Sequence, residues 1–511
     1  MRLQTHSGRP SRAQARWAGV LAMAAIGMAG CRMAAVRAQA PPAIAIQAHW
    51  RRVTAISSAT PTLQVVVNPL LRRGSPIHDA AFQALKNLGA DEVRFVPWLP
   101  YPRLAVAELR PPRAGRADWD FSLIDPIVRD FFRATRGHSR IVNFSTIPQW
   151  MFATARPVAY PADPNQVVWN YEQGRRLRVP ISAVAAYYAR LASWYMRGGF
   201  RDETGRWHAS GYHYKIQYWE VLNEVDFEHS MSPRFYTRLY RGITAALHRV
   251  APRMKFVGAA LAMPSLNPEF FDYFLDPRHR RGAPLDMLSY HFYASPTPGQ
   301  DLRDWQYTFF DQADHFLDSV RYIQAIRQRL AWSTKTDADE LGCILPHDTA
   351  PHLVKPIPPR YWNLCGAMYA YLYARLAALG VQVAGESQLV GYPSQFPSVT
   401  MVDWRTGKPN ARYWILKLLH DHLGPGDRLV STLGGGSAIF AQAVITPAGA
   451  RELLLVNKRD RNIEVALPGA KGATVESVNR AYQPPAAAQV PGNTLALAPF
   501  QVSVVSWRPR R

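Results

Sequence analysis

The chain has 511 residues, of which 48% are hydrophobic and 19% charged, so it is too apolar for a disordered protein and too long for one small domain. Its formal net charge of +23 at pH 7 favours anionic partners such as nucleic acid, a membrane surface or an acidic polysaccharide. The arginines are scattered, however, and no segment has the pattern of a nucleic-acid-binding module, so we expect no nucleic-acid partner. Only three cysteines are present, which excludes a disulfide framework and a cysteine-rich metal cluster.

The first 40 residues have the pattern of an export signal. Four arginines precede an apolar run of small residues at 17–30, which is too short to span a membrane. The small residues at 38–40 before Pro41 fit ordinary signal cleavage, whereas the segment 28–31 is similar to a lipoprotein box with a lipid anchor at Cys31. The pattern favours a cleaved periplasmic or extracellular protein over a lipoprotein. Removing 1–40 would remove six arginines and no acidic residue, and would lower the formal net charge from +23 to +17.

Between residues 61 and 423, short apolar segments alternate with amphipathic helical segments, which predicts βα units and a parallel sheet. Ser232-Pro233 has the pattern of a helix start, and apolar residues then recur every three or four positions up to Val250. A helix over the apolar positions 184–195 is expected to stop at Gly198-Gly199. Helices are also predicted at 309–329 and 361–379. Eight strands are predicted, at 63–67, 92–97, 140–145, 215–222, 255–260, 286–292, 331–338 and 381–386. The expected fold class is therefore α/β, with a (β/α)8 TIM barrel at 61–423.

After residue 424 the predicted helices stop. Short strand-like runs at 438–444, 452–456, 464–467 and 502–507 are separated by Gly, Pro and Asn, which predicts a β-sandwich domain over 424–511. Residues 41–60 are predicted as an N-terminal extension, whose segment 44–57 adds a strand to that sandwich. Cys343 and Cys365 could pair in an oxidising compartment, and two free thiols are equally compatible with the sequence.

Acidic residues end two of the predicted strands, where a TIM barrel has its active site. The fourth strand runs through Trp219 and Glu220 to Asn223 and Glu224, and the seventh is followed by Glu340. Glycosidic cleavage requires two facing carboxyl groups, one protonated to assist the leaving oxygen and one ionised to attack the anomeric carbon. Strand alternation predicts that Glu220 points away from Asn223 and has a structural role.

The segment 219–224, Trp-Glu-Val-Leu-Asn-Glu, resembles the strand-four signature of clan A glycoside hydrolases, which are retaining (β/α)8 enzymes. More narrowly, the chain resembles glycoside hydrolase family 39, the β-xylosidase and α-L-iduronidase family. The motifs 286–293, 93–95 and 119–121 with Asp125 support this, and the likeness covers residues 60–508.

The resemblance implies a role for each matching residue. Glu224 matches the general acid/base and Asn223 the residue that binds the sugar 2-hydroxyl. Arg94 matches the arginine that supports the nucleophile, and His291 and Tyr293 match the substrate-contacting position on strand six. Glu340 matches the nucleophile, although this chain has Asp-Glu-Leu-Gly at 339–342 where the family usually has Thr-Glu and then an aromatic residue. The rival nucleophiles are Asp337, Asp339 and Glu386.

Aromatic residues follow strands two and three, where flat rings can stack on sugars. Trp98 and Trp150 are the candidates for substrate binding. We expect an exported retaining glycoside hydrolase, β-xylosidase-like, that acts on an oligo- or polysaccharide by double displacement without a metal or organic cofactor. The alternatives are a clan A endo-glycanase and a non-catalytic glycan-binding barrel. The sugar, the linkage and the oligomeric state cannot be inferred from the sequence.

Overall fold

A computed structural model describes residues 42–154, 158–171, 176–348, 356–479 and 483–507 of the chain. The predicted export signal at 1–40, including Cys31, lies outside the described residues. Within the described part of the chain, no helix combines the length and the apolar character that a membrane span requires.

Eight parallel strands form a closed barrel, in the spatial order β11-β12-β13-β14-β15-β2-β3-β6. The predicted TIM barrel is thereby confirmed, and each predicted strand overlaps an observed one. The seventh lies further along the chain than predicted, because β14 stays paired with β13 as far as Cys343. The barrel strands are β2 (Thr60–Val66), β3 (Val93–Val96), β6 (Arg140–Val142), β11 (Tyr218–Glu220), β12 (Lys255–Leu261), β13 (Met287–Ala294), β14 (Lys335–Cys343) and β15 (Val383–Glu386).

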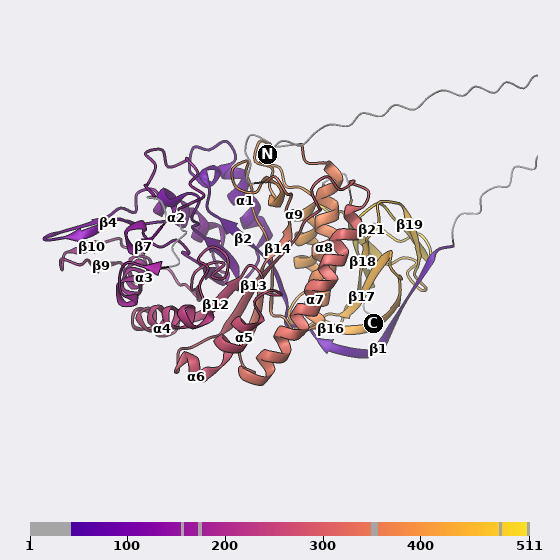
Figure 1. Ribbon diagram of the computed structural model, residues 1–511. Coiled ribbons are helices and arrows are strands. Elements are labelled where there is room, and N and C mark those ends of the chain that lie inside the picture. Colours follow the sequence, from indigo (N-terminus) through magenta and orange to yellow (C-terminus); the bar gives the residue numbers. More distant parts are fainter. Residues whose placement is uncertain (1–41, 155–157, 172–175, 349–355, 480–482, 508–511) are drawn as a thin grey trace, which may run out of the picture. The chain divides into compact units, whose positions relative to one another are not determined.

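Helices connect the strands and cover the outside of the barrel (Figure 1). The predicted start of α4 is confirmed, since the Ser232 hydroxyl accepts a hydrogen bond from the Phe235 N–H and Pro233 is the first helical residue. Gly198, with φ of 79°, follows the end of α3 as expected. The helices are α1 (His78–Leu88), α2 (Asp125–Ala134), α3 (Ile181–Met196), α4 (Pro233–Val250), α5 (Pro268–Leu275), α6 (Pro277–Arg280), α7 (Trp305–Leu330), α8 (Pro359–Ala378) and α9 (Ala411–His422).

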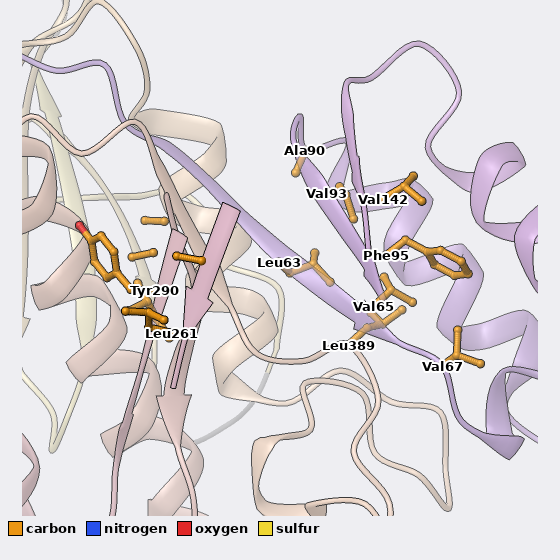
Figure 2. Close-up of a cluster of buried hydrophobic side chains, with 14 of the residues drawn as sticks. Leu63, Val65, Val67, Ala90, Val93, Phe95, Val142, Leu261, Tyr290 and Leu389 are labelled. Atoms are coloured by element: carbon orange, nitrogen blue, oxygen red, sulfur yellow. The ribbon is translucent and has the colours of Figure 1, made fainter. Parts of the chain in front are cut away.

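The two faces of each barrel strand have different surroundings. On β2 and β3, the side chains of Leu63, Val65 and Phe95 belong to the large core under the helices, and Figure 2 shows them in one cluster. Gln64 and Arg94, which alternate with them, bind each other inside the barrel. A small apolar cluster of Ile141, Tyr218, Val257, Met287 and Val383 fills the inner face near the start of the strands. The polar residues nearer the strand ends therefore rest on an apolar floor.

The loops of the barrel contain short strands and 3-10 turns. The hairpin at 199–209 lies between α3 and β11 and so precedes a barrel strand, whereas the other pieces each follow a barrel strand. The short strands and turns are η1 (Pro69–Leu71), η2 (Pro102–Leu104), η3 (Gln149–Met151), η5 (Pro397–Val399), and the hairpin partners β4 (Glu108–Arg113) with β5 (Arg116–Trp119), β7 (Phe152–Ala153) with β8 (Arg176–Leu177), and β9 (Gly199–Arg201) with β10 (Trp207–Ala209).

A mainly antiparallel sheet follows the barrel, and the N-terminal strand β1 lies inside it. β1 pairs antiparallel with β16 and, through its first two residues, parallel with β19, so it joins the β19–β22 pair to the other strands. Leu453 and Leu455 of β18 face the apolar core of this domain, whereas Leu454 and Val456 belong to the barrel core. The strands are β1 (Ile44–Ile56), β16 (Arg428–Gly434), β17 (Ile439–Ile445), β18 (Arg451–Asn457), β19 (Ile463–Ala466), β20 (Thr474–Val478), β21 (Ala488–Gln489), β22 (Thr494–Leu497) and β23 (Val502–Trp507).

Candidate active site

Strand alternation on β13 explains why His291 and Tyr293 reach the same space. Leu288 and Tyr290 pack into the outer core, so the intervening Ser289, His291 and Tyr293 face the barrel interior. There the Ser289 hydroxyl donates to Glu220 at 2.5 Å, and the Tyr293 hydroxyl donates to Glu340 at 2.7 Å. His291 and Tyr293, the two residues predicted on strand six, therefore both lie at the mouth of the barrel.

A β-bulge on β14 places two consecutive acidic residues in the interior. Ser289 pairs with Asp337 but His291 pairs with Glu340, so two steps along β13 correspond to three along β14. The extra residue changes which side chains point inward after Asp337. As a result, Asp339 Oδ2 and Glu340 Oε1 lie 2.9 and 2.5 Å from the Arg94 guanidinium.

A second departure from regular strand geometry occurs after β11. Leu222 has φ of 64° and Glu224 has φ of 41°, both in the left-handed region that non-glycine residues rarely occupy. The backbone turn breaks the alternation, so Glu220 and Asn223 both contact Arg94, each at 2.6 Å. The expectation that Glu220 points away from Asn223 was therefore wrong.

Arg94 lies at the centre of the site and is 1% exposed. Its Nε donates to Glu220, its Nη2 to Asn223, and its Nη1 to both Gln64 Oε1 at 2.7 Å and Glu340 Oε1. Burial opposes the charge, but the surrounding carboxylates outweigh it and hold the pKa of Arg94 well above its ordinary value. One fixed cation thus orients Glu340 and Asn223 together.

Glu224 and Glu340 face each other across His291. His291 Nδ1 lies 3.0 Å from Glu224 Oε1 and 3.6 Å from Glu340 Oε2. One oxygen of each carboxyl group and one ring nitrogen lie within 4.8 Å of one another. Carboxyl groups of retaining glycosidases lie about 5–5.5 Å apart and those of inverting enzymes about 6.5–9.5 Å apart. The separation at this site is therefore shorter than the inverting range and nearer to the retaining one.

The electrostatic surroundings of the two glutamates differ. Burial raises the pKa of Glu224, and the contact with His291 only partly offsets it. Burial disfavours the imidazolium form of His291, but Glu340, Asp339 and Glu224 outweigh that effect and raise its pKa well above the ordinary value. Glu340 accepts hydrogen bonds from the Arg94 guanidinium and the Tyr293 hydroxyl. The site therefore favours a proton on Glu224, whereas Glu340 lies beside a fixed cation.

Glu224, His291 and Glu340 are close enough together to hold a metal ion. The donor set argues against one, because the Arg94 guanidinium binds Glu340 Oε1 and the Tyr293 hydroxyl binds Glu340 Oε2. A cation bound to Glu340 would lie next to the fixed positive charge of Arg94 and would compete with these donors.

A cavity of about 850 Å³ lies over Glu224, Glu340 and Asn223. Trp98 lines it as predicted, and its indole N–H donates to Glu228 at 2.5 Å. Trp150 does not line the cavity, since its indole N–H donates to the Glu108 carbonyl in a neighbouring loop. Trp169, rather than Trp150, lines the cavity.

Trp169 and Phe396 were not singled out from the sequence. Both line the cavity, and they pack against Trp98 with ring centroids 5.5 and 5.8 Å from it. The Trp169 indole N–H has no hydrogen-bond partner among the described residues. For Trp169, the only available sequence signal was its position in the long segment 147–180, which follows strand three.

The three rival nucleophiles all lie outside the lining of this cavity. Glu386 is fully buried and binds Arg412 Nε at 2.8 Å, and burial raises its pKa to about 7. Asp337 is buried below the bulge, and burial together with Asp339, Glu220 and Glu92 raises its pKa well above the ordinary value. Asp339 contacts Arg94 and His291 rather than the cavity. Glu340 is the acidic residue on β14 that faces the cavity.

Comparison with solved structures identifies similar folds among glycosidases. The chain superimposes on a GH51 arabinofuranosidase from Xanthomonas axonopodis pv. citri with a TM-score of 0.62 at 14% identity, covering 91% of this chain and 99% of that one. A GH30 endoxylanase from Clostridium papyrosolvens C71 matches with a TM-score of 0.55 at 12% identity, over 90% and 99% of the chains. A glucosidase from Croceicoccus marinus gives 0.57 at 14% identity, over 89% and 97%. At these identities the shared property is the fold, a TIM barrel with an appended β-domain.

One family model matches part of the C-terminal domain. Residues 437–505 match the model described as D-apionate lactonase, C-terminal immunoglobulin-like domain. The search of curated proteins found no match to this chain.

Proposed function

We propose that the protein is an exported retaining glycoside hydrolase of the clan A type, with Glu340 as nucleophile and Glu224 as general acid/base. The observation that carries the proposal is the close pair of carboxyl groups: an oxygen of Glu224 and an oxygen of Glu340 lie within 4.8 Å of each other, Arg94 binds Glu340, and burial raises the pKa of Glu224. The glycosidase names of proteins with the same fold support it.

In the first step, a carboxylate oxygen of Glu340 attacks the anomeric carbon while Glu224 transfers its proton to the departing glycosidic oxygen. The C–O bond to the leaving group breaks, and a glycosyl ester of Glu340 forms. Glu224, now ionised, then accepts a proton from water as that water attacks the anomeric carbon. Release of the sugar returns Glu340 to its carboxylate form and leaves the proton on Glu224.

Other residues would position these groups and the substrate. Asn223, held by Arg94 and by a 2.9 Å hydrogen bond to Glu228, would present its amide to the sugar 2-hydroxyl. The rings of Trp98, Trp169 and Phe396 would stack on or bound the sugar. Assignment to family 39 and β-xylosidase-like specificity rest on the sequence motifs at 93–95, 119–121, 219–224 and 286–293.

Hydrolysis of a panel of aryl glycosides tests the roles. We expect the wild type to cleave one sugar class, Glu224→Ala to lose about a hundred- to ten-thousand-fold in kcat/KM, and Glu340→Gly to lose activity that azide restores as a glycosyl azide. Glu269→Ala, an exposed change on α5, should leave kcat/KM unchanged and serves as the control. Covalent labelling by a fluorinated glycosyl reagent should modify Glu340; labelling of Glu386 would contradict the assignment.

A second candidate is hydrolysis of a sugar lactone, which the match of residues 437–505 to a lactonase family's C-terminal domain favours. Turnover of aldonolactones by the wild type, with no turnover of any aryl glycoside or polysaccharide, would replace the first proposal by the second.

A further inference from the structure

Two grooves of about 770 Å³ each lie away from the candidate active site. The first, between α4 and the segment 280–284, we call the α4–α6 groove. The second, at 213–218 and 251–255, includes the first residues of β11 and β12 and we call it the β11–β12 groove. Because barrel strands are parallel and the candidate site lies at their carboxyl ends, the β11–β12 groove lies at the opposite end of the barrel.

The lining of both grooves is strongly basic. The α4–α6 groove is lined by four arginines and one histidine without any acidic residue: Arg238, Arg241, His248, Arg280 and Arg281. The β11–β12 groove is lined by five basic residues and a single acid, Glu92: Arg197, His213, Lys215, Arg253 and Lys255. Helix α4 itself contains no Asp or Glu. Across the two linings, ten basic residues therefore face one acidic residue, Glu92.

Arg280 carries a buried charge that no carboxylate neutralises. It is 7% exposed, its Nη1 donates to the Phe274 carbonyl at 2.6 Å, and its Nε has no hydrogen-bond partner among the described residues. Asp276, the carboxylate that acts on Arg280 electrostatically, is bound by Arg278 at 2.6 Å. Burial lowers the pKa of Arg280. Because an uncompensated buried charge is costly, an anion in the groove would stabilise it.

The basic residues extend over a longer distance than a single small anion could span. Arg241 and His248 are two helical turns apart on α4, which corresponds to about 10 Å along the axis. His248 lines the first groove, and Ala251, three residues further, lines the second. The matching ligand has several negative charges spaced along a chain.

We propose that the α4–α6 and β11–β12 grooves form one secondary binding surface for an anionic polysaccharide, with Arg241 and Arg281 binding its carboxylates. Guanidinium groups bind carboxylates through two parallel hydrogen bonds, so a uronate polymer suits them. Surfaces for single-stranded nucleic acid use aromatic stacking. The α4–α6 groove has no aromatic side chain in its lining, and the β11–β12 groove has two tyrosines, Tyr214 and Tyr218. Nucleic acid is therefore the alternative that the experiment tests. The proposal concerns binding outside the cavity and does not depend on the catalytic roles.

Calorimetric titration with an oligogalacturonate tests the proposal. The wild type should bind it, and Arg241→Ala with Arg281→Ala should weaken binding by about tenfold or more. Raising NaCl from about 0.05 M to about 0.5 M should also weaken binding, because the contacts are ionic. Arg249→Ala removes an exposed arginine of the same helix that lines neither groove and should bind as the wild type does.

Four results separate this surface from the alternatives. Glu224→Gln should bind the oligosaccharide as tightly as the wild type, since the grooves are separate from the cavity; loss of binding in Glu224→Gln alone would overturn the proposal. Equal weakening by Arg249→Ala would show that only general charge acts and would also overturn it. Duplex DNA that binds more tightly than the oligosaccharide would replace a polysaccharide by a nucleic acid. For Arg280→Met, the oligosaccharide should raise the Tm less than for the wild type.

Discussion

His291 lies between the two candidate catalytic carboxyl groups and is held from behind by Asp339, 3.4 Å from Nε2. Its positive charge lowers the pKa of Glu224 against the effect of burial. In His291→Gln that charge is lost, so the pKa of Glu224 should rise. The alkaline limb of kcat/KM against pH, where Glu224 loses its proton, should then move to higher pH.

The matched variant His315→Gln changes an exposed histidine on α7 and should leave the pH profile unchanged. An alkaline limb that stays in place or moves to lower pH in His291→Gln would contradict this account.

Trp169 offers an indole N–H without a partner among the described residues, at the wall of the cavity. If a substrate hydroxyl accepts from it, Trp169→Phe removes one hydrogen bond and keeps an aromatic ring. We expect KM to rise by about tenfold with kcat nearly unchanged, because the contact forms in the ground state and the transition state alike. Trp150→Phe, outside the cavity lining, should change neither constant.

At the scale of elements, the strands and their order along the chain could be predicted because each is a short apolar run bounded by turns. Glu224 could be singled out because it follows a strand, whereas Arg94 was assigned only from the family resemblance of the segment 93–95. The bulge at Asp339 and the left-handed Leu222 could not be predicted, because both depend on pairing with neighbouring strands rather than on local sequence. Trp169 lies in a long loop whose path no periodicity indicates.

The inner face of β14 also carries Asp337, which is fully buried and whose two oxygens have no hydrogen-bond partner among the described residues. Its pKa is raised in the folded state, so the folded protein holds a proton that the unfolded chain releases above about pH 4. Stability therefore falls as pH rises through this range. Asp337→Asn stays neutral, so its unfolding free energy relative to the wild type should increase from about pH 4 to about pH 7 in urea titrations. A difference independent of pH would contradict this.

At the scale of the whole molecule, a disulfide ties the active-site strand to the outer helix layer. Cys343, at the end of β14, is bonded to Cys365 of α8, 22 residues further along the chain. The sequence left this pairing open. Closing a loop of this length contributes about 3 kcal/mol in the chain-entropy account. We expect Cys343→Ala with Cys365→Ala to lower the Tm and the unfolding free energy by about this amount. Addition of reductant should destabilise the wild type but leave the double variant unchanged.

The place of β1 between β16 and β19 has a consequence for how the gene can be divided. The ribosome makes this strand before the whole barrel, yet its partners at 428–434 and 463–466 are made last. A fragment containing only 424–511 would lack the strand that connects its two-stranded piece to the rest. Transplanting the C-terminal domain onto another enzyme therefore requires residues from both ends of the chain, and the barrel is enclosed as an insertion within a single β-domain.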